Sequence, residues 1–120
     1  MVATKLAYES ATRSDGTRIL VDRLWPRGVN KAEARVKQWM RELGPSNELR
    51  RFFGHDPKRW NEFRKRYLAE LERPVARALL DRLLLMARAG KLTLVYGAKD
   101  EQHNQAVVIK RVLESRLKMS

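Results

Sequence analysis

Two short apolar runs in this chain predict β-strands. Residues 17–25 are rich in apolar and β-branched side chains and follow a turn-forming Ser-Asp-Gly sequence at 14–16, which is typical of a strand that begins after a tight turn. Residues 92–96 are apolar at nearly every position and lie between Gly90 and Gly97. A strand without alternating polar positions is expected to be buried on both faces, as in a parallel sheet covered by helices.

Apolar residues at helical spacing predict helices in the rest of the chain. Each predicted helix begins at a residue that is favoured at helix N-termini, and the stop signals are Gly or Pro: from Ser46, after Pro45, to Gly54; from Asp56-Pro57 to Pro74; from Val75 through Ala89 to Gly90; and from Asn104 onward. The residues expected to face the core are Leu49, Phe52 and Phe53 in the first helix, Trp60, Phe63, Tyr67 and Leu71 in the second, Leu79, Leu80, Leu83, Leu84 and Met86 in the third, and Ala106, Ile109, Val112, Leu113 and Leu117 in the fourth.

The first third of the chain has a less regular pattern. Residues 5–9 are expected to pair with the strand over 17–25 as a hairpin. Asn30 offers an N-cap to a short helix, because helix-forming residues follow it. Residues 36–43 also fit a short second strand, and the pattern leaves both interpretations open.

These elements predict a single three-layer α/β domain that spans residues 1–120. Its small, mostly parallel sheet is expected to include residues 18–25 and 91–97, flanked by helices that start near Pro57, Val75 and Asn104. A chain of 120 residues can bury about two thirds of its unfolded surface in one core.

Composition removes several classes of function. The chain contains no cysteine, which excludes thiolate nucleophiles, disulfides and Cys-ligated metal centres. Its two histidines, His55 and His103, lack the spacing of a helical metal site, so we expect no metal. No glycine-rich phosphate loop and no Gly-x-Ser-x-Gly elbow occurs, so we also expect no cofactor.

No apolar run approaches the length of a membrane span, and the N-terminus lacks the apolar stretch of a secretory signal. We therefore expect a cytoplasmic location and no membrane partner. Nothing in the sequence predicts an oligomeric state.

The formal net charge of +12 indicates an anionic partner. Positive charge is densest over residues 50–66, where seven Lys and Arg residues face two carboxylates. This basic surface is a candidate for contacting nucleic acid, and a solvated helix face is the alternative explanation.

The end of the predicted strand over 17–25 carries charged and aromatic residues next to a Pro and a Gly: Asp22, Arg23, Trp25 and Arg27. The second strand is followed by Lys99 and Asp100. If the two strands are parallel neighbours, their carboxyl ends bring these side chains to the crevice where open α/β sheets bind ligands. Arginine and lysine there predict a pocket for an anion.

Each candidate residue also has a purely structural interpretation. The arginines can form ion pairs with Asp22 and Asp100, and Trp25 can belong to the core or stack on a ring of a ligand. His55 and Asp100 are the candidate proton carriers, although His55 also fits a plain loop residue beside the helix-capping Asp56. The ligand-binding candidates are Asp22, Arg23, Trp25, Arg27, Lys99 and Asn104.

Four motifs occur in order along the chain: Val21-Asp-Arg-Leu-Trp-Pro-Arg-Gly28, Pro45-Ser46 with Leu49-Arg50, Phe53-Gly-His-Asp56 with Trp60, and Tyr96-Gly-Ala-Lys-Asp100 with Asn104. With these motifs the chain resembles, over about residues 7 to 117, the YeaO-like family of uncharacterised bacterial proteins, a domain of unknown function numbered 488. The resemblance implies a compact α/β domain without an established activity. It implies that a family function would be carried by Asp22, Arg23, Trp25, Arg27, His55, Lys99 and Asp100.

Related longer proteins have a Cys-containing segment after the last strand. This chain has Gly97-Ala-Lys-Asp100 there, so thiol chemistry does not carry over with the resemblance.

The sequence leads to two hypotheses about function. The first is an enzyme or a ligand-binding protein for an anionic, phosphorylated or nucleotide-like small molecule in the strand-end pocket. The alternative is a nucleic-acid-binding module that uses the basic surface around residues 50–66.

Overall fold

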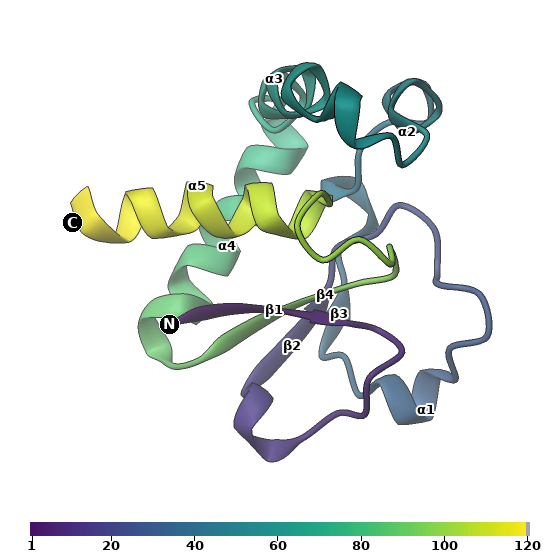
Figure 1. Cartoon of the computed structure of the whole chain (residues 1–120). Helices are drawn as coiled ribbons and strands as arrows, with labels where there is room; N and C mark the ends of the chain where they lie inside the picture. Colours follow the sequence, from purple (N-terminus) through teal and green to yellow (C-terminus); the bar gives the residue numbers. More distant parts are fainter. Residues whose placement is uncertain (120) are drawn as a thin grey trace.

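A sheet of four parallel strands lies at the centre of the protein (Figure 1). The computed structural model describes residues 1–119. The strands are β1 (Val2–Leu6), β2 (Thr17–Leu20), β3 (Gln38–Trp39) and β4 (Leu92–Tyr96), and they lie in the order β1-β4-β2-β3. Each neighbouring pair is parallel, with Leu6 opposite Tyr96 and Leu20 opposite Val95. The predicted pairing of the two apolar strands as parallel neighbours is confirmed.

Helices and loops cover both faces of the sheet, which confirms the predicted three-layer α/β fold (Figure 1). One face is covered by α4 (Pro74–Ala89) and α5 (Gln105–Met119), and α2 (Asn47–Phe53) and α3 (Trp60–Glu70) lie on the same side, farther from the sheet (Figure 1). The opposite face is covered by α1 (Lys31–Ala34) and by the loops on either side of it. Within residues 1–119, no helix combines the length and the apolar character that a membrane span requires.

Strand β4 is buried on both faces, as its uninterrupted apolar sequence predicts. Leu92, Leu94 and Tyr96 point into the large core under α2 to α5, whereas Val95 points into a smaller core on the α1 side. Leu20 joins Val95 there, next to partly buried tryptophans. The central strand therefore separates two apolar clusters.

The helix boundaries follow the capping signals of the sequence. The Ser46 hydroxyl accepts a hydrogen bond from the backbone N–H of Leu49 at 3.2 Å, and Gly54 ends α2 in the left-handed conformation with φ 51°. The Asp56 carboxylate accepts the N–H of Lys58 at 3.0 Å. A short 3₁₀ turn over Pro57–Arg59 then precedes α3. Both predicted helix starts are confirmed.

Two predictions for the strands are wrong. The segment over residues 5–9 does not form a hairpin with the next strand, because β1 ends at Leu6 and pairs in parallel with β4, which separates it from β2. The strand predicted over 17–25 ends at Leu20. Val21 still donates its N–H to the carbonyl of Val95 at 3.1 Å, but the chain then leaves the sheet and its next residues face a cleft.

The interpretations of residues 30–43 and of the third helix are correct in part. Asn30 caps the single-turn helix α1, and the strand predicted as an alternative over 36–43 is limited to Gln38–Trp39.

In α4 the buried positions are Ala76, Leu80, Leu83 and Ala87, while the predicted Leu79, Leu84 and Met86 are partly buried. Small alanines take core positions there because they let α4 pack closely on its neighbours.

A buried ion pair lies beneath the sheet on the α1 side. The Arg18 guanidinium donates to the Asp15 carboxylate at 2.7 Å and to the Ala34 carbonyl at 2.9 Å. Lys5 donates to both oxygens of Asp15 at 3.1 Å. Burial alone raises the pKa of Asp15, but hydrogen bonds from Thr12, Lys5 and Arg18 outweigh it and hold the pKa well below its usual range. The positive charges of Lys5 in β1 and Arg18 in β2 are thereby balanced by the carboxylate of Asp15.

Candidate functional site

A cleft of about 660 Å³ opens at the carboxyl ends of β2 and β4. After β2 the chain crosses to the α1 face of the sheet, and after β4 it crosses to the opposite face, where α5 begins (Figure 1). Two neighbouring strands whose connections leave in opposite directions form a topological switch point, the usual ligand position in open α/β sheets. The eight residues singled out from the sequence all line this cleft: Asp22, Arg23, Trp25, Arg27, His55, Lys99, Asp100 and Asn104.

Asp22 links the two strand ends. Its carboxylate accepts the backbone N–H of Gly97 at 2.9 Å, and its other oxygen accepts a hydrogen bond from the Gln105 amide at the start of α5. A Cβ atom at Gly97 would lie 2.8 Å from this carboxylate, so the close approach requires glycine. Burial raises the pKa of Asp22 to about 6, because the hydrogen bonds and the charge of Arg50 offset only part of the desolvation.

Arg23 has a structural role. Its guanidinium donates to the carbonyl oxygens of Gly44 at 2.9 Å and Pro45 at 3.4 Å. The backbone of Arg23 lies so close to Gly44 that a Cβ atom there would be 2.3 Å from the Arg23 nitrogen. These contacts fix the loop after β2 against the segment that leads into α2.

The expected ion pairs between the site's arginines and its carboxylates are not formed. Within residues 1–119, no Lys or Arg nitrogen lies within 4.0 Å of the carboxylates of Asp22 or Asp100. This structural alternative is not realised, because Arg23 donates to backbone carbonyls and the Arg27 side chain is exposed. The positive side chains of the cleft are thus free of carboxylate partners.

Three exposed cations line the cleft from three separate segments: Arg27 after β2, Arg50 on α2, and Lys99 after β4. The Tyr8 hydroxyl donates to the Arg27 carbonyl at 2.8 Å and so holds the loop that carries Arg27. The N-terminus of α5, with the positive end of its helix dipole, borders the same cleft through Gln105. The arrangement concentrates positive potential at the mouth of the cleft.

Two tryptophans stiffen the loop after β2. The Trp25 indole donates to the Val29 carbonyl at 2.8 Å, and the Trp39 indole donates to the Asp22 carbonyl at 2.7 Å. Their rings meet edge to face with centroids 5.5 Å apart. Trp25 is partly buried and lines the cleft with one side, so it combines a packing role with an accessible ring.

Asp100 and Asn104 organise the loop after β4. Asp100 accepts hydrogen bonds from the backbone of Gln102 and His103 and from His103 Nδ1 at 2.8 Å. The hydrogen bond from the His103 side chain is the main reason why the pKa of Asp100 is lowered. Asn104 is buried, donates to the Asp100 carbonyl at 2.9 Å and accepts the N–H of Val107 at 3.2 Å. Both side chains are thus engaged within their own segment.

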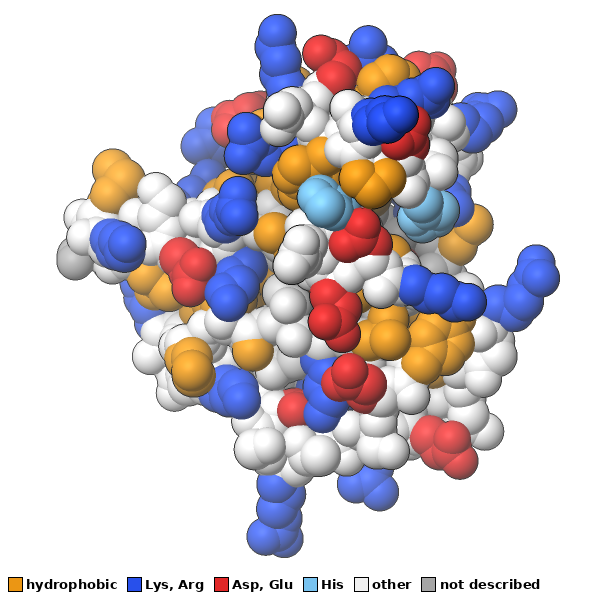
Figure 2. All heavy atoms as spheres, in the orientation of Figure 1, with side chains coloured by type: hydrophobic (Ala, Val, Ile, Leu, Met, Phe, Trp, Pro, Cys, Tyr) orange, Lys and Arg blue, Asp and Glu red, His pale blue; other side chains and the backbone are white. Residues whose placement is uncertain are grey.

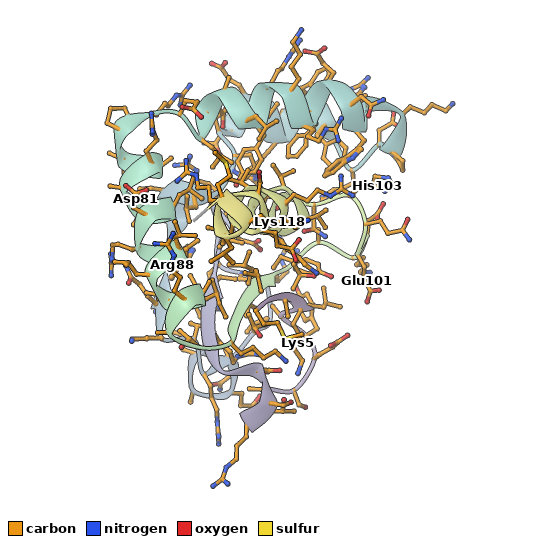
Figure 3. All side chains as sticks on the ribbon, turned by 90° about the vertical axis from the view of Figure 1, so that its left-hand side faces the viewer. Lys5, Asp81, Arg88, Glu101, His103 and Lys118 are labelled. Carbon is orange, nitrogen blue, oxygen red and sulfur yellow. The ribbon has the colours of Figure 1, made fainter. Side chains whose placement is uncertain are left out.

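The two histidines line the cleft from different segments of the chain. His103 lies on the loop after β4 (Figure 3), and its ring meets the Trp60 ring of α3 edge to face with the ring centroids 5.2 Å apart. His55 is exposed and has a left-handed backbone with φ 57°, directly after the left-handed Gly54. Such a conformation is uncommon for a residue with a side chain. Within residues 1–119, no group of three His, Asp or Glu residues is arranged to hold a metal ion.

The basic surface around residues 50–66 includes carboxylates that form ion pairs with two of its arginines. Arg59 pairs with Asp56 at 3.8 Å, and Arg66 pairs with Glu62 at 2.8 Å. Both guanidinium groups also lie over the Phe52 ring. On the face in Figure 2, Lys and Arg side chains are dispersed among acidic and neutral ones.

A family model described as the inactive DUF488-N3 subclade matches residues 1–120. The chain belongs to the DUF488 family. A relative in this family, "Uncharacterized protein YeaO" from Escherichia coli, is 41% identical over 114 residues, which cover 95% of this chain and 97% of the relative. "Uncharacterized protein Rv3073c" from Mycobacterium tuberculosis is 37% identical over 109 residues, or 91% of this chain and 90% of that protein. No solved structure matches this DUF488 chain significantly.

The cleft of this DUF488 protein is also lined by residues that are not among the sequence candidates, and these include Tyr8, Arg50 and Gln105. Arg50 was assigned to the basic surface, although it stands in one of the four motifs, which is a signal that pointed to the site. Tyr8 and Gln105 carry no local signal, because they reach the cleft only through the pairing of β1 with β4 and the placement of α5.

Proposed function

We propose that this protein binds an anionic small molecule, phosphorylated or nucleotide-like, in the cleft at the carboxyl ends of β2 and β4. The observation that carries this proposal is that Arg27, Arg50 and Lys99, none of them paired with a carboxylate of the site, line the same cleft, which the N-terminus of α5 also borders. Arg recognises phosphate through a planar set of donors, and a helix N-terminus adds backbone N–H groups. The volume of about 660 Å³ suits a small metabolite.

The proposed role is binding without turnover. The description of the matching subclade as inactive supports it. So does the engagement of Asp100, the candidate proton carrier, by three hydrogen bonds of its own loop. His55 remains the one exposed candidate for proton transfer among the described residues that line the cleft, and within residues 1–119 its ring forms no hydrogen bond that would activate or orient it.

Thermal-shift and calorimetric titration with inorganic phosphate and with adenosine monophosphate test the proposal. A ligand that binds only the folded state at 100 times its Kd stabilises it by about 2.7 kcal/mol. We expect stabilisation that Arg50→Ala and Lys99→Ala each weaken. The matched control is Arg88→Ala, which removes one exposed cation from α4, on the side of α5 away from the loop that carries Lys99 (Figure 3). Equal weakening by all three variants indicates nonspecific charge and refutes the site.

The alternative, nucleic-acid binding at the basic surface, is supported by the exposure of Arg51, Lys58 and Lys65. It predicts binding of single- or double-stranded DNA that falls steeply with salt. Lys58→Ala and Lys65→Ala should then reduce the salt dependence, whereas Lys99→Ala should not. This outcome would favour the alternative over the cleft.

A further inference from the structure

Asp22 is a carboxylate that lines the cleft without a cationic partner. The chain carries 26 Lys and Arg residues, yet none of the described ones has its charged nitrogen within 4.0 Å of this carboxylate. Its two oxygens accept one hydrogen bond each from Gly97 and Gln105. An ionised carboxylate offers about four acceptor positions, so about two remain unfilled on a side chain that lines the cleft.

The cleft therefore has two chemically different ends. Asp22 follows the fully buried Val21 and accepts a hydrogen bond from Gly97, the residue directly after β4, which places it at the base of the cleft. Arg27 and Lys99 are exposed and belong to the mouth. Arg50 acts on Asp22 through its charge but forms no salt bridge with it. The base of the cleft thus carries the carboxylate acceptor of Asp22, and the mouth carries the positive side chains of Arg27 and Lys99.

This polarity restricts the ligand. A second anionic group at the base would meet the carboxylate of Asp22 and be repelled. An ammonium group at the base would pair with Asp22, but it would also lie near the positive charges of Arg50 and of the α5 N-terminus. A hydroxyl group can donate a hydrogen bond to the carboxylate of Asp22. Because it carries no net charge, it is not repelled by the positive charge of Arg50 or of the α5 N-terminus.

We propose that the ligand is a phosphorylated sugar whose hydroxyl groups donate hydrogen bonds to Asp22 while its phosphate lies between Arg27, Arg50 and Lys99 at the mouth of the cleft. This inference rests on the proposed anion-binding function and adds the chemical class and the orientation of the ligand. Gly97 supports it, since any side chain there would close the space beside the Asp22 carboxylate. The partly buried ring of Trp25 offers an apolar wall for the sugar face.

Calorimetric titration of the whole protein with three probes tests this orientation: ribose 5-phosphate, n-pentyl phosphate and inorganic phosphate. Pentyl phosphate has the same number of carbon atoms as the sugar phosphate but no hydroxyl groups. We expect ribose 5-phosphate to bind about tenfold more tightly than pentyl phosphate, because hydrogen bonds to a charged acceptor discriminate by about that factor. Asp22→Asn should remove most of this preference and leave pentyl phosphate bound equally or more tightly.

The matched control is Glu101→Gln, which removes one exposed carboxylate from the loop after β4 without touching the cleft (Figure 3). It should leave the tenfold preference intact. Equal binding of all three probes, with the affinity for each raised by Asp22→Asn, would refute the sugar inference and keep the anion site. Tighter binding of glucosamine 6-phosphate than of glucose 6-phosphate would assign an ammonium group to Asp22 and overturn the proposal. Absence of binding by every phosphate compound refutes the proposed function itself.

Discussion

Replacing Asp22 with Asn should stabilise the protein at neutral pH, although it removes a side chain of the candidate site. Burial raises the pKa of Asp22 from its usual 3.8 to about 6. The native state therefore holds this proton more tightly than the unfolded chain. The contribution to stability is complete below pH 4 and is lost as the pH rises through about 6.

The size of the effect follows from the two pKa values. Each pKa unit corresponds to about 1.4 kcal/mol, so the ionised carboxylate of Asp22 lowers the free energy of unfolding by up to about 3 kcal/mol at pH 7 relative to its protonated form. Asn is isosteric and uncharged. Its oxygen can accept the N–H of Gly97, and its amide can donate to Gln105 once the Gln105 amide rotates.

Urea denaturation of the wild type and of Asp22→Asn at pH 4.5, 5.5, 6.5 and 7.5 measures the difference. We expect the variant to gain stability over the wild type between about pH 4 and pH 6, and to keep a constant advantage above that range. Asp81→Asn is the control, since its carboxylate is 72% exposed on α4. A variant that is equally stable or less stable than the wild type at pH 7.5 would refute the reasoning from desolvation.

Two further predictions concern the supports of the cleft. Gly44→Ala should destabilise the fold by more than about 2 kcal/mol in urea denaturation, because its Cβ atom would lie 2.3 Å from the Arg23 nitrogen, whereas Gly90→Ala meets nothing within 4 Å and should be tolerated. Glu70→Ala should cost about 2 kcal/mol and weaken phosphate binding, because Glu70 accepts the Ser46 N–H at 2.8 Å and the Ser46 hydroxyl at 2.5 Å and thereby fixes α2, which carries Arg50. Glu72→Ala, at a side chain that is 67% exposed, should change stability by less than about 0.5 kcal/mol. An equal loss of stability in Gly44→Ala and Gly90→Ala, or in Glu70→Ala and Glu72→Ala, would contradict these roles.

Most of the helices could be read from the sequence because their signals are local. Ser46, Asp56 and Gly54 mark helix ends through contacts with residues two to four positions away, and the structure preserves each of these contacts. The core faces of α3 and α5 follow the same logic, since helical spacing alone decides which side chains share a face. The exact end of β2 was missed because the strand pattern continues past Leu20, where the ladder stops.

The candidate site was predicted for a different reason. The motif residues after β2 and β4 pointed to strand ends, and neighbouring parallel strands bring their carboxyl ends together. The chemistry among those residues could not be predicted. Asp22 and Arg23 are adjacent and opposite in charge, yet one bonds to Gly97 and Gln105 and the other to Gly44 and Pro45.

The sequence by itself determined the class of fold, the helix boundaries and the burial of β4 on both faces, because these depend on the period and capping chemistry of short segments. Only the tertiary structure decided that β1 pairs with β4 rather than with β2, and that Arg50 reaches the cleft. It also decided the raised pKa of Asp22, since desolvation depends on every element packed around a group. Pairing, proximity and burial arise between residues far apart in the chain, and no local pattern encodes them.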